Sequence, residues 1–446
     1  MLVRRVALAV TLVVALGATG LVGTAAAAGS GGSSGSGGSG QFKNLKPVKP
    51  PSPCTNDPGV SATEIKVGAI LPKTGPSAPS FASSEDGMRA RFDLANSTNE
   101  LGPRKITFTS VDDVGDPARN VTAAQQLNEQ NGVFGIVENS LSADASAKYL
   151  HQQGVPVTGW HLGLASFGTY PNMFGWKNSF PPDAGVNTFT TLNLDFLKTK
   201  GVTKVALVGA NSGNSSIFVD QIAKQIQLLG GKTMKVVYHT DSVTLDQRDF
   251  TAEAQKIKDS GADAVATGMD FLQDTALASA LDQDNYKVKV LLFPAAEDTR
   301  ILHLPGIEGA YFGIEAAPFE QNPPAFVTYK AQMDKAGKFA ESEVSYIGWL
   351  SADTFLEGIK AAGVSCPTRK GFITNLRLEK GWTAHGAFNP PVDFSDIFGR
   401  PFRCVYFMQV MNATFVPQFD GKPFCATAEI HGKKVTKFTP AEQAKG

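Results

Sequence analysis

The most constraining feature of this sequence is a regular alternation of short apolar runs with amphipathic segments. The apolar runs predict β-strands at 64–71, 105–111, 133–137, 155–159, 204–209, 233–239, 264–268 and 288–293. The amphipathic segments predict α-helices at 84–95, 118–128, 146–152, 186–197, 217–229, 250–258 and 274–281. Strands that alternate with helices are typical of βαβ units and a parallel sheet. The sequence therefore predicts an α/β fold.

The alternation is interrupted at 167–182, where Gly, Pro, Asn and aromatic residues replace it. A full α/β set on each side of this break predicts two similar lobes in tandem. After a strand at 310–314, three helices follow without strands of their own, at 325–335, 345–361 and 369–376. We expect these helices to pack on the first lobe, with chain crossings near Pro181, Glu315 and Phe394. The first lobe then comprises 61–181 plus 316–394, and the second comprises 182–315 plus 395–446.

The N-terminus has the pattern of an export signal. Arg4 and Arg5 precede an apolar run, and the small residues at 25–28 suit cleavage by a signal peptidase. We therefore expect a signal peptide at 1–28. The alternative is an uncleaved anchor, because the uncharged stretch at 6–28 is long enough to span a bilayer.

A linker is expected to follow the signal peptide. Residues 29–60 are rich in Gly and Ser and then in Pro, so the folded body is expected to begin near Ser61. The first cysteine is Cys54, far beyond the apolar run, so lipid attachment at that run is not expected. We expect a protein exported to the cell envelope or the extracellular space that is not a lipoprotein.

Composition restricts the partners and the chemistry. Lys plus Arg and Asp plus Glu number 41 each, whereas nucleic acids and anionic membranes attract a basic excess. The histidines are scattered and no Cys-x-x-Cys pair occurs, so no metal site is expected. The sequence has no Gly-x-Ser-x-Gly elbow, dinucleotide glycine pattern or phosphate-binding loop. We expect a non-enzymatic protein without a cofactor that does not bind nucleic acid.

Four cysteines in an exported chain indicate disulfides. Cys404 and Cys425 flank two strand-like runs at 405–410 and 414–417 and could staple a hairpin, which leaves Cys54 to pair with Cys366. The alternative is four free buried thiols.

Several segments, in the same order, resemble the leucine/isoleucine/valine-binding proteins, which are type I periplasmic binding proteins. They are KVGAILPKTGP at 66–76, EDGMRARFDLAN at 85–96, Asp112–Asp113, PVDFS at 391–395 and RCVYFMQV at 403–410. The resemblance covers about 61–425. It implies two Rossmann-like lobes with parallel sheets joined by a three-crossover hinge, and it places each cysteine pair in one lobe.

The resemblance also implies a function. Such proteins are the solute receptors of ABC importers: they close on a small ligand between the lobes and dock on a membrane permease. A branched-chain amino acid is the default ligand. A sensor that reports the solute to a membrane partner is the alternative that the sequence leaves open.

On the first lobe, the resemblance places candidate ligand contacts in the turn after the strand at 133–137. Ser140, Ser142 and Ala143 lie in this turn, where hydroxyls and free N–H groups can hold a carboxylate. Ser142 can equally be a helix N-cap. Trp160 and His161 follow the next strand and are expected to line the pocket, although Trp160 can instead pack between the lobes. Phe81 is a further candidate from the first loop.

On the second lobe, the candidate contacts are Asn214, Asp270 and Glu297, each in a turn after a strand. Asp270 is the expected partner of a ligand ammonium, and its alternative role is helix capping. The tyrosine that the family often carries at 211–216 is missing here. Together with Trp160 and His161, this departure leaves amides and aromatic acids open as ligands.

Overall fold

The computed structural model describes residues 41–443 except 56, 162, 178–185 and 295–296. The predicted signal peptide, the Gly/Ser-rich residues at 29–40 and the expected crossing near Pro181 lie outside the described residues. The described chain forms two α/β lobes, each built on a sheet that is mainly parallel. The prediction of this fold class is confirmed.

The sheet of the first lobe is entirely parallel and has the strand order β2-β1-β3-β4-β5. Its strands are β1 (Glu64–Leu71), β2 (Lys105–Asp112), β3 (Gly135–Glu138), β4 (Val157–Gly159) and β5 (Met173–Phe174). Strands β3 and β4 are buried throughout, as parallel strands covered on both faces are. The polar ligand contacts predicted for this lobe follow the carboxyl ends of these two strands.

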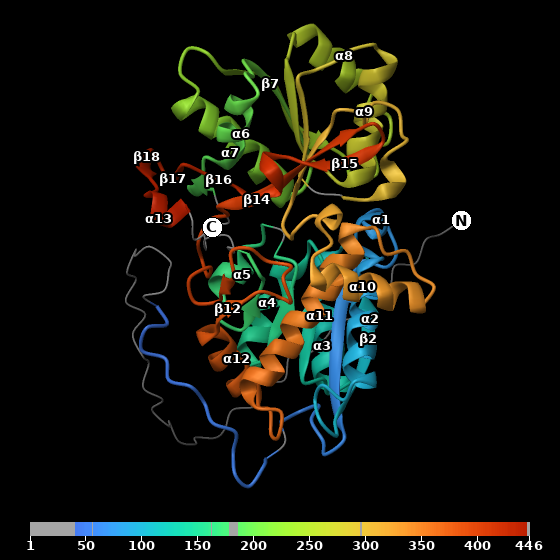
Figure 1. Cartoon of the computed structure of the whole chain (residues 1–446), viewed down its shortest axis with the longest axis vertical. Coiled ribbons are helices and arrows are strands. Elements are labelled where there is room, and N and C mark those ends of the chain that lie inside the picture. Colours follow the sequence, from blue (N-terminus) through green and yellow to red (C-terminus); the bar gives the residue numbers. More distant parts are fainter. Residues whose placement is uncertain (1–40, 56, 162, 178–185, 295–296, 444–446) are drawn as a thin grey trace, which may run out of the picture. The chain divides into compact units, whose positions relative to one another are not determined.

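Helices from two separated parts of the chain belong to the first lobe. The N-terminal group is α1 (Ala78–Phe81), α2 (Ser84–Ser97), α3 (Pro117–Gln125), η1 (Gln126–Gln130), α4 (Ala143–Gln152) and α5 (Ser166–Thr169). The later group is η3 (Phe319–Gln321), α10 (Pro324–Lys335), α11 (Glu343–Ala362) and α12 (Arg369–Leu378), followed by the hairpin β12 (Lys380–Trp382) and β13 (Val392–Asp393). Figure 1 shows the orange helices α10 and α11 beside the blue helix α2.

Glycines allow the close contact between α2 and α11. A Cβ on Gly87 would lie 1.8 Å from the carbonyl oxygen of Ser345, and one on Gly348 would lie 1.9 Å from that of Ser84. The two backbones can therefore approach only because neither position carries a side chain. Met88, Trp349 and Phe355 pack around this contact in one hydrophobic core, which joins the N-terminal sheet to the later helices.

The sheet of the second lobe has the order β15-β14-β11-β10-β9-β7-β8, with β16 also paired to β14. Its parallel strands are β7 (Lys204–Ala210), β8 (Lys235–Val243), β9 (Ala264–Gly268), β10 (Val290–Phe293) and β11 (Tyr311–Ile314). Its antiparallel strands are β14 (Cys404–Met411), β15 (Thr414–Pro417) and β16 (Phe424–Cys425). The helices are α6 (Leu192–Thr199), α7 (Gly213–Leu229), α8 (Thr251–Ser260), α9 (Phe271–Gln283), η2 (Thr299–Ile301) and η4 (Phe419–Gly421).

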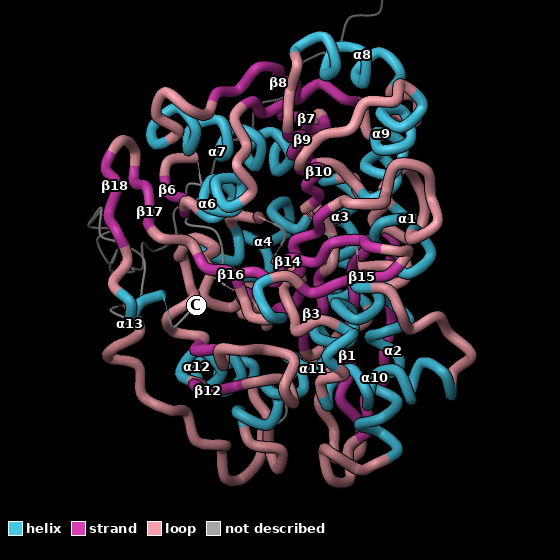
Figure 2. Tube along the Cα trace, turned by 45° about the horizontal axis from the view of Figure 1, so that its top comes forward, coloured by secondary structure: helices cyan, strands magenta, loops and turns pink. Residues whose placement is uncertain are grey.

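The predicted helix at 186–197 is only partly correct. Residues Thr188–Thr190 form strand β6, and α6 starts at Leu192. The strand is stabilised by a C-terminal hairpin, β17 (Ala428–His431) and β18 (Lys434–Lys437), which the sequence did not predict. Figure 2 shows β18, β17 and β6 side by side. The chain then ends in α13 (Pro440–Gln443).

The folded body begins earlier than the expected Ser61. The Phe42 side chain is buried, with its ring 5.1 Å from that of Phe398. Further along, Val48 N donates to Asn375 Oδ1 at 2.7 Å, and Asn375 Nδ2 donates to Val48 O at 2.9 Å. These contacts hold the Pro-rich segment against the first lobe, because its apolar groups and backbone find partners there. Among the described residues, no helix combines the length and apolar character needed to cross a membrane.

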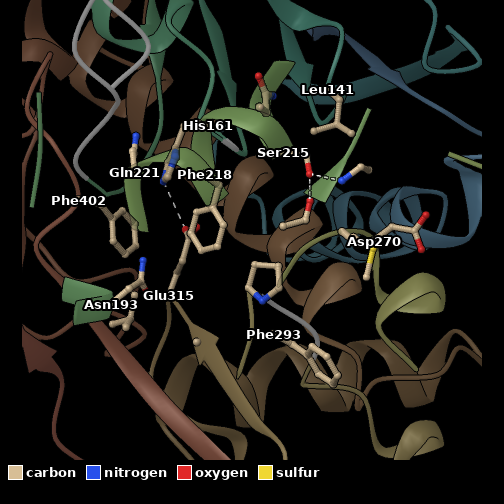
Figure 3. A pocket seen from close by; sticks show the side chains of 18 of the residues that line it. Leu141, His161, Asn193, Ser215, Phe218, Gln221, Asp270, Phe293, Glu315 and Phe402 are labelled. Atoms are coloured by element: carbon tan, nitrogen blue, oxygen red, sulfur yellow. Dashed lines mark hydrogen bonds and ion pairs between the residues drawn. The ribbon is translucent and has the colours of Figure 1, made fainter. Parts of the chain in front are cut away.

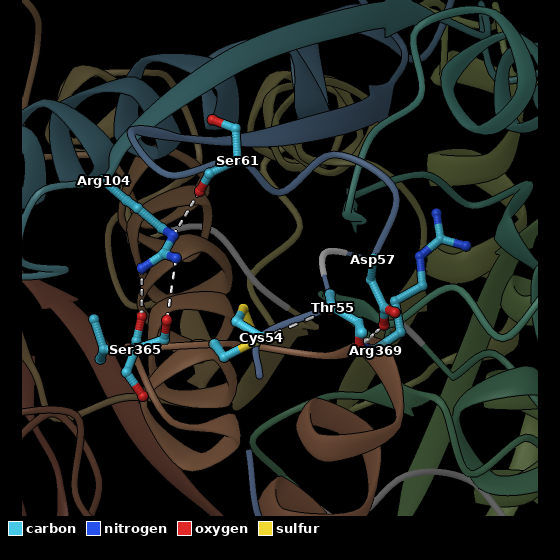
Figure 4. Close-up of a disulfide and its surroundings, with 9 residues drawn as sticks. Cys54, Thr55, Asp57, Ser61, Arg104, Ser365 and Arg369 are labelled. Carbon is cyan, nitrogen blue, oxygen red and sulfur yellow. Dashed lines mark hydrogen bonds between the residues drawn. A yellow bond between two sulfur atoms is a disulfide. The ribbon is translucent and has the colours of Figure 1, made fainter. Parts of the chain in front are cut away.

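Both predicted disulfides are present. Cys54 pairs with Cys366 in the first lobe (Figure 4), and Cys404 pairs with Cys425 across β14 and β16 in the second. The same figure shows Arg104 donating to the carbonyl oxygens of Ser61 and Ser365, at 2.7 and 3.1 Å. The alternative of four free thiols is wrong, because the chain has no free cysteine.

Candidate ligand-binding site

A pocket of about 300 Å³ is lined by residues of both lobes. This volume is at the small end of the range for small-molecule sites. The pocket lies at the carboxyl ends of β4, β7, β9, β10 and β11, where parallel α/β sheets bind ligands. It receives residues from the loop before α1, from strand β6 and from the segment that leads into β14.

The lining is mainly apolar. Its large apolar side chains are Phe81, Leu141, Trp160, Phe189, Leu192, Phe218, Leu245, Met269, Phe271, Leu292, Phe293, Phe402, Val405 and Phe407. Within the described part of the lining there is no Lys or Arg. Such a surface suits a ligand whose contact is mostly hydrophobic, oriented by a few polar groups.

Glu315 is the centre of a polar cluster at one side of this pocket. Its Oε1 accepts a hydrogen bond from Trp160 Nε1 at 3.2 Å, and its Oε2 accepts one from Trp176 Nε1 at 2.9 Å. His161 Nε2 lies 3.5 Å from the same Oε2, as Figure 3 shows. Burial by itself would raise the pKa of Glu315, but His161, Trp160 and Lys177 outweigh it and hold the pKa below its ordinary value. The carboxyl group is therefore ionised at neutral pH.

Lys177 supplies a second positive charge near this carboxylate. The side chain is only 7% exposed, and burial lowers its pKa to about 8 despite the opposing effect of Glu315. The lysine therefore stays mostly charged at neutral pH and loses its proton in mildly alkaline solution. It does not line the pocket, so it acts on a ligand only through this cluster.

Five of the nine predicted contacts line the pocket: Phe81, Trp160, His161, Asn214 and Asp270. Trp160 also touches Phe81, with ring centroids 5.8 Å apart. Asp270 serves as the N-cap of α9 in a capping box with Gln273, and burial raises the pKa of its carboxyl. The capping role considered for Asp270 is therefore present, with one oxygen committed to the helix, in a residue that also lines the pocket.

Ser140, Ser142 and Ala143 are not among the lining residues. Ser140 Oγ donates to Asp113 Oδ2, and Ser142 Oγ donates to the carbonyl oxygen of Gly115 at 2.8 Å. Ser142 occupies the N-cap position of α4, but its side chain does not cap the helix. The structure therefore directs both hydroxyls into the first lobe, because buried carboxylate and carbonyl oxygens there need donors.

A second buried carboxyl group lies behind these serines. Glu138, at the end of β3, accepts from Asn120 Nδ2 at 3.0 Å, and the same amide donates to Asp113 Oδ2 at 3.0 Å. Burial and the nearby Asp113 raise the pKa of Glu138 well above its ordinary value. These hydrogen bonds hold the turn after β3 in place, and this is the turn that the sequence predicted to contact the ligand.

Glu297 also lies outside the pocket lining, in a buried acidic group. Its Oε1 accepts from Phe319 N at 3.3 Å, and its backbone N–H donates to Glu343 Oε2 at 3.4 Å. Burial, Glu320 and Glu343 together raise the pKa of Glu297 well above its ordinary value. The carboxyl of Glu343, which does line the pocket, was not predicted.

The sequence reasoning also missed Glu315, which was identified only as a chain crossing. The signal that could have found it is its position, because Glu315 directly follows β11 at the same sheet edge as the other contacts. In the described residues, no cluster of His, Cys, Asp and Glu is arranged to hold a metal ion.

A sequence model of the periplasmic binding proteins matches residues 64–414. Among curated relatives, Leu/Ile/Val-binding protein homolog 3 of Brucella melitensis is 25% identical over 307 residues, which cover 67% of this chain and 80% of the relative. Homolog 1 of the same organism is 22% identical over 340 residues, covering 72% of this chain and 84% of the relative.

Solved structures share the fold at low sequence identity. A branched-chain amino acid ABC transporter protein from Thermus thermophilus with bound valine has a TM-score of 0.70 and 16% identity, covering 82% of this chain and 97% of that one. A solute-binding protein from R. palustris in complex with benzoate has a TM-score of 0.64 and 15% identity, covering 86% and 99%. A fatty acid ABC transporter substrate-binding protein from Thermomonospora curvata has a TM-score of 0.68 and 18% identity, covering 83% and 95%. With a family match over most of its length and this fold, the chain belongs to the periplasmic binding protein family.

Proposed function

We propose that this protein is the exported receptor of an ABC importer and that it captures a small, mainly apolar solute between its lobes. The observation that carries the proposal is the pocket, because apolar side chains of both lobes surround a cavity of about 300 Å³. A ligand in contact with both lobes stabilises the closed arrangement over the open one. The closed receptor then docks on a membrane permease.

The same pocket argues for a receptor rather than an enzyme. Its polar lining side chains are engaged largely in structural contacts, such as the Asp270 capping box and the bond from Gln225 Oε1, which accepts from Leu194 N at 3.0 Å. Among the described lining residues, no nucleophile is paired with a base in the manner that covalent catalysis needs. Binding and release are the chemistry that this arrangement supports.

Two ligand classes have specific support. Branched-chain amino acids are supported by the relatives' names and by valine in the Thermus thermophilus protein. Apolar acids without an amino group are supported by benzoate in the R. palustris protein and by the arrangement of this pocket. Here the hydroxyls of Ser140 and Ser142 are used inside the first lobe, so the expected amino-acid grip is not formed.

A thermal-shift screen with purified protein tests the proposal. A solute that binds only the native state at about 100 times its Kd stabilises it by about 2.7 kcal/mol. We expect shifts with at least one member of a panel of L-leucine, L-phenylalanine, benzoate, phenylacetate and 4-methylpentanoate. If no apolar solute of this panel or of a broader metabolite library binds, the proposal is wrong.

A variant pair tests the location. Phe218→Ala removes an aromatic wall from the pocket and is expected to weaken binding about tenfold. Phe339→Ala is the matched control, because Phe339 is 42% exposed and does not line the pocket. Equal affinities of the two variants would place the ligand elsewhere. Stimulation of the ATPase of a co-reconstituted permease would separate an importer from a sensor, which would bind the solute without it.

A further inference from the structure

Three buried polar side-chain atoms in the described pocket lining have no hydrogen-bond partner within the protein. In the described lining, the buried side-chain atoms without a hydrogen-bond partner are Ser80 Oγ and the two ring nitrogens of His161. The His161 side chain is 2% exposed. Leaving a buried ring nitrogen without a hydrogen-bond partner costs free energy. The ring is therefore available for a hydrogen bond with a ligand.

The acidic lining groups are engaged instead. Both oxygens of Glu315 accept indole N–H bonds, Asp270 accepts from Gln273 N, and Glu343 accepts from Glu297 N. Each of these groups is an acceptor that already has a donor. The unpartnered groups, an imidazole and a hydroxyl, can both donate. A ligand that supplies acceptors therefore completes the site better than one that supplies an ammonium group.

The position of the ring defines which nitrogen is available. His161 Nε2 faces Glu315 Oε2 at 3.5 Å, and Phe402 lies beside the ring, with centroids 5.9 Å apart. Because Nε2 faces the carboxylate, Nδ1 is the ring nitrogen that has no group of the protein beside it to accept or donate a hydrogen bond. The charged group that faces the ring is Glu315, from the segment after β11, and Lys177, from the segment after β5, acts electrostatically on Glu315. Asp270 and Glu343 are the other carboxyl groups of the described pocket lining.

We propose that His161 is the head-group site of this receptor, and that its ring binds the carboxylate of an apolar monocarboxylic acid through Nδ1–H. The assignment rests on the proposed receptor function and specifies its ligand class. Lys177, which is buried and acts electrostatically on Glu315, offsets part of the negative charge of that carboxylate.

Isothermal titration calorimetry with three isosteric probes tests the charge. Benzoate carries the carboxylate, benzamide replaces it with a neutral amide, and benzylamine carries an ammonium group. We expect benzoate to bind at least about tenfold more tightly than benzamide near pH 6, and benzylamine to bind least well. Tighter binding of benzamide or benzylamine would overturn the assignment and leave the receptor function standing. Binding of L-leucine but not of 4-methylpentanoate would do the same.

The variant His161→Gln keeps a donor without the charge, and His239→Gln is its control, since His239 is partly exposed and outside the pocket. We expect the His161 variant to lose about tenfold or more in benzoate affinity and to bind benzamide within about twofold of the wild type. Unchanged benzoate binding would overturn the assignment. The affinities of the wild-type protein for the three probes decide the question if the variant does not fold. Absence of binding by every apolar solute tested would instead refute the receptor function itself.

Discussion

The two lobes join their chain segments by partly different means. In the first lobe, buried arginines connect parts that are distant in sequence: Arg91 Nε donates to Asp353 at 2.7 Å, and Arg377 donates to the carbonyl oxygens of Phe394 and Met173 at 2.9 and 2.8 Å. Aromatic rings join distant segments in both lobes. In the first, the ring centroids of Phe134 and Phe355 are 6.3 Å apart, and in the second, Phe196 of α6 stacks on Phe407 of β14 with centroids 3.9 Å apart.

The difference has a physical consequence. A buried guanidinium leaves a charge or several carbonyl oxygens without a partner when it is removed, whereas a ring leaves a cavity that neighbours can partly fill. Removing a buried arginine from the first lobe should therefore lower the free energy of unfolding more than removing an aromatic ring from the second. All four tryptophans are in the first lobe: Trp160, Trp176 and Trp349 belong to its core, and Trp382 packs against that core. Tryptophan fluorescence consequently reports on that lobe, while far-ultraviolet circular dichroism reports on both.

The largest effect is expected for Arg91→Met. This change leaves Asp353, which is 3% exposed, without its partner and should lower the free energy of unfolding by about 3–5 kcal/mol. The measurement is urea unfolding followed by tryptophan fluorescence. Arg89→Met is the control on the same helix, because Arg89 is 48% exposed and pairs with Glu85 at the surface. It should cost about 1 kcal/mol or less. Similar losses for the two variants would remove the basis of the comparison.

The next largest difference is expected between the contributions of the two disulfides to stability. Their sequence separations are 312 residues for Cys54–Cys366 and 21 for Cys404–Cys425. In the chain-entropy description, the longer loop should contribute about 2 kcal/mol more to stability. We expect the double Ser variant of the first pair to shift the urea midpoint further than that of the second. The reverse order would show that native contacts, rather than loop length, determine the contribution.

A smaller effect is expected for Phe407→Leu in the second lobe. Losing the stacked pair with Phe196 should cost about 0.5–1.5 kcal/mol beyond the lost apolar area. Circular dichroism should record the shift while the tryptophan transition stays near that of the wild type. Met411→Leu is the control on the same strand, because Met411 is 42% exposed. A tryptophan transition that moves equally would mean that the lobes unfold together.

The smallest effect on stability is expected for the loss of a surface ion pair. Lys287→Ala removes a surface pair with Asp282 in which the lysine is 75% exposed. The free energy of unfolding should change by about 0.5 kcal/mol or less in the same urea assay. A larger change would show that surface charge, and not only aromatic packing, contributes to the stability of the second lobe.

Local pattern predicted most of this fold, because each strand and helix of an α/β lobe has its own periodicity. The expected strands at 64–71 and 264–268 match β1 and β9 residue for residue. Strand β6 was predicted as helix because its stability comes from β17, almost 240 residues later. The segment near Phe42 was assigned to a linker because Pro-rich chain has no periodicity, and only its tertiary partners reveal that it is packed.

The location of the candidate site could be predicted from the sequence, but the hydrogen bonds of its residues could not. Position after a parallel strand indicated Trp160, His161 and Asp270, which line the pocket. Sequence could not show that Ser140 and Ser142 donate inside the lobe, because that depends on where Asp113 and the Gly115 carbonyl lie. For the same reason it could not bring together Glu315 and the indole of Trp176, 139 residues apart.

The route of the chain between the lobes affects its synthesis. When the ribosome has completed residue 300, the first sheet still lacks α11, and the second still lacks β11 and β14. Each partial sheet then has an uncovered apolar face or an open edge, and such surfaces bind chaperones or aggregate. Neither lobe can be completed before about nine-tenths of the chain has been made. In a nascent chain of this topology, both cores therefore stay incomplete until synthesis is nearly finished.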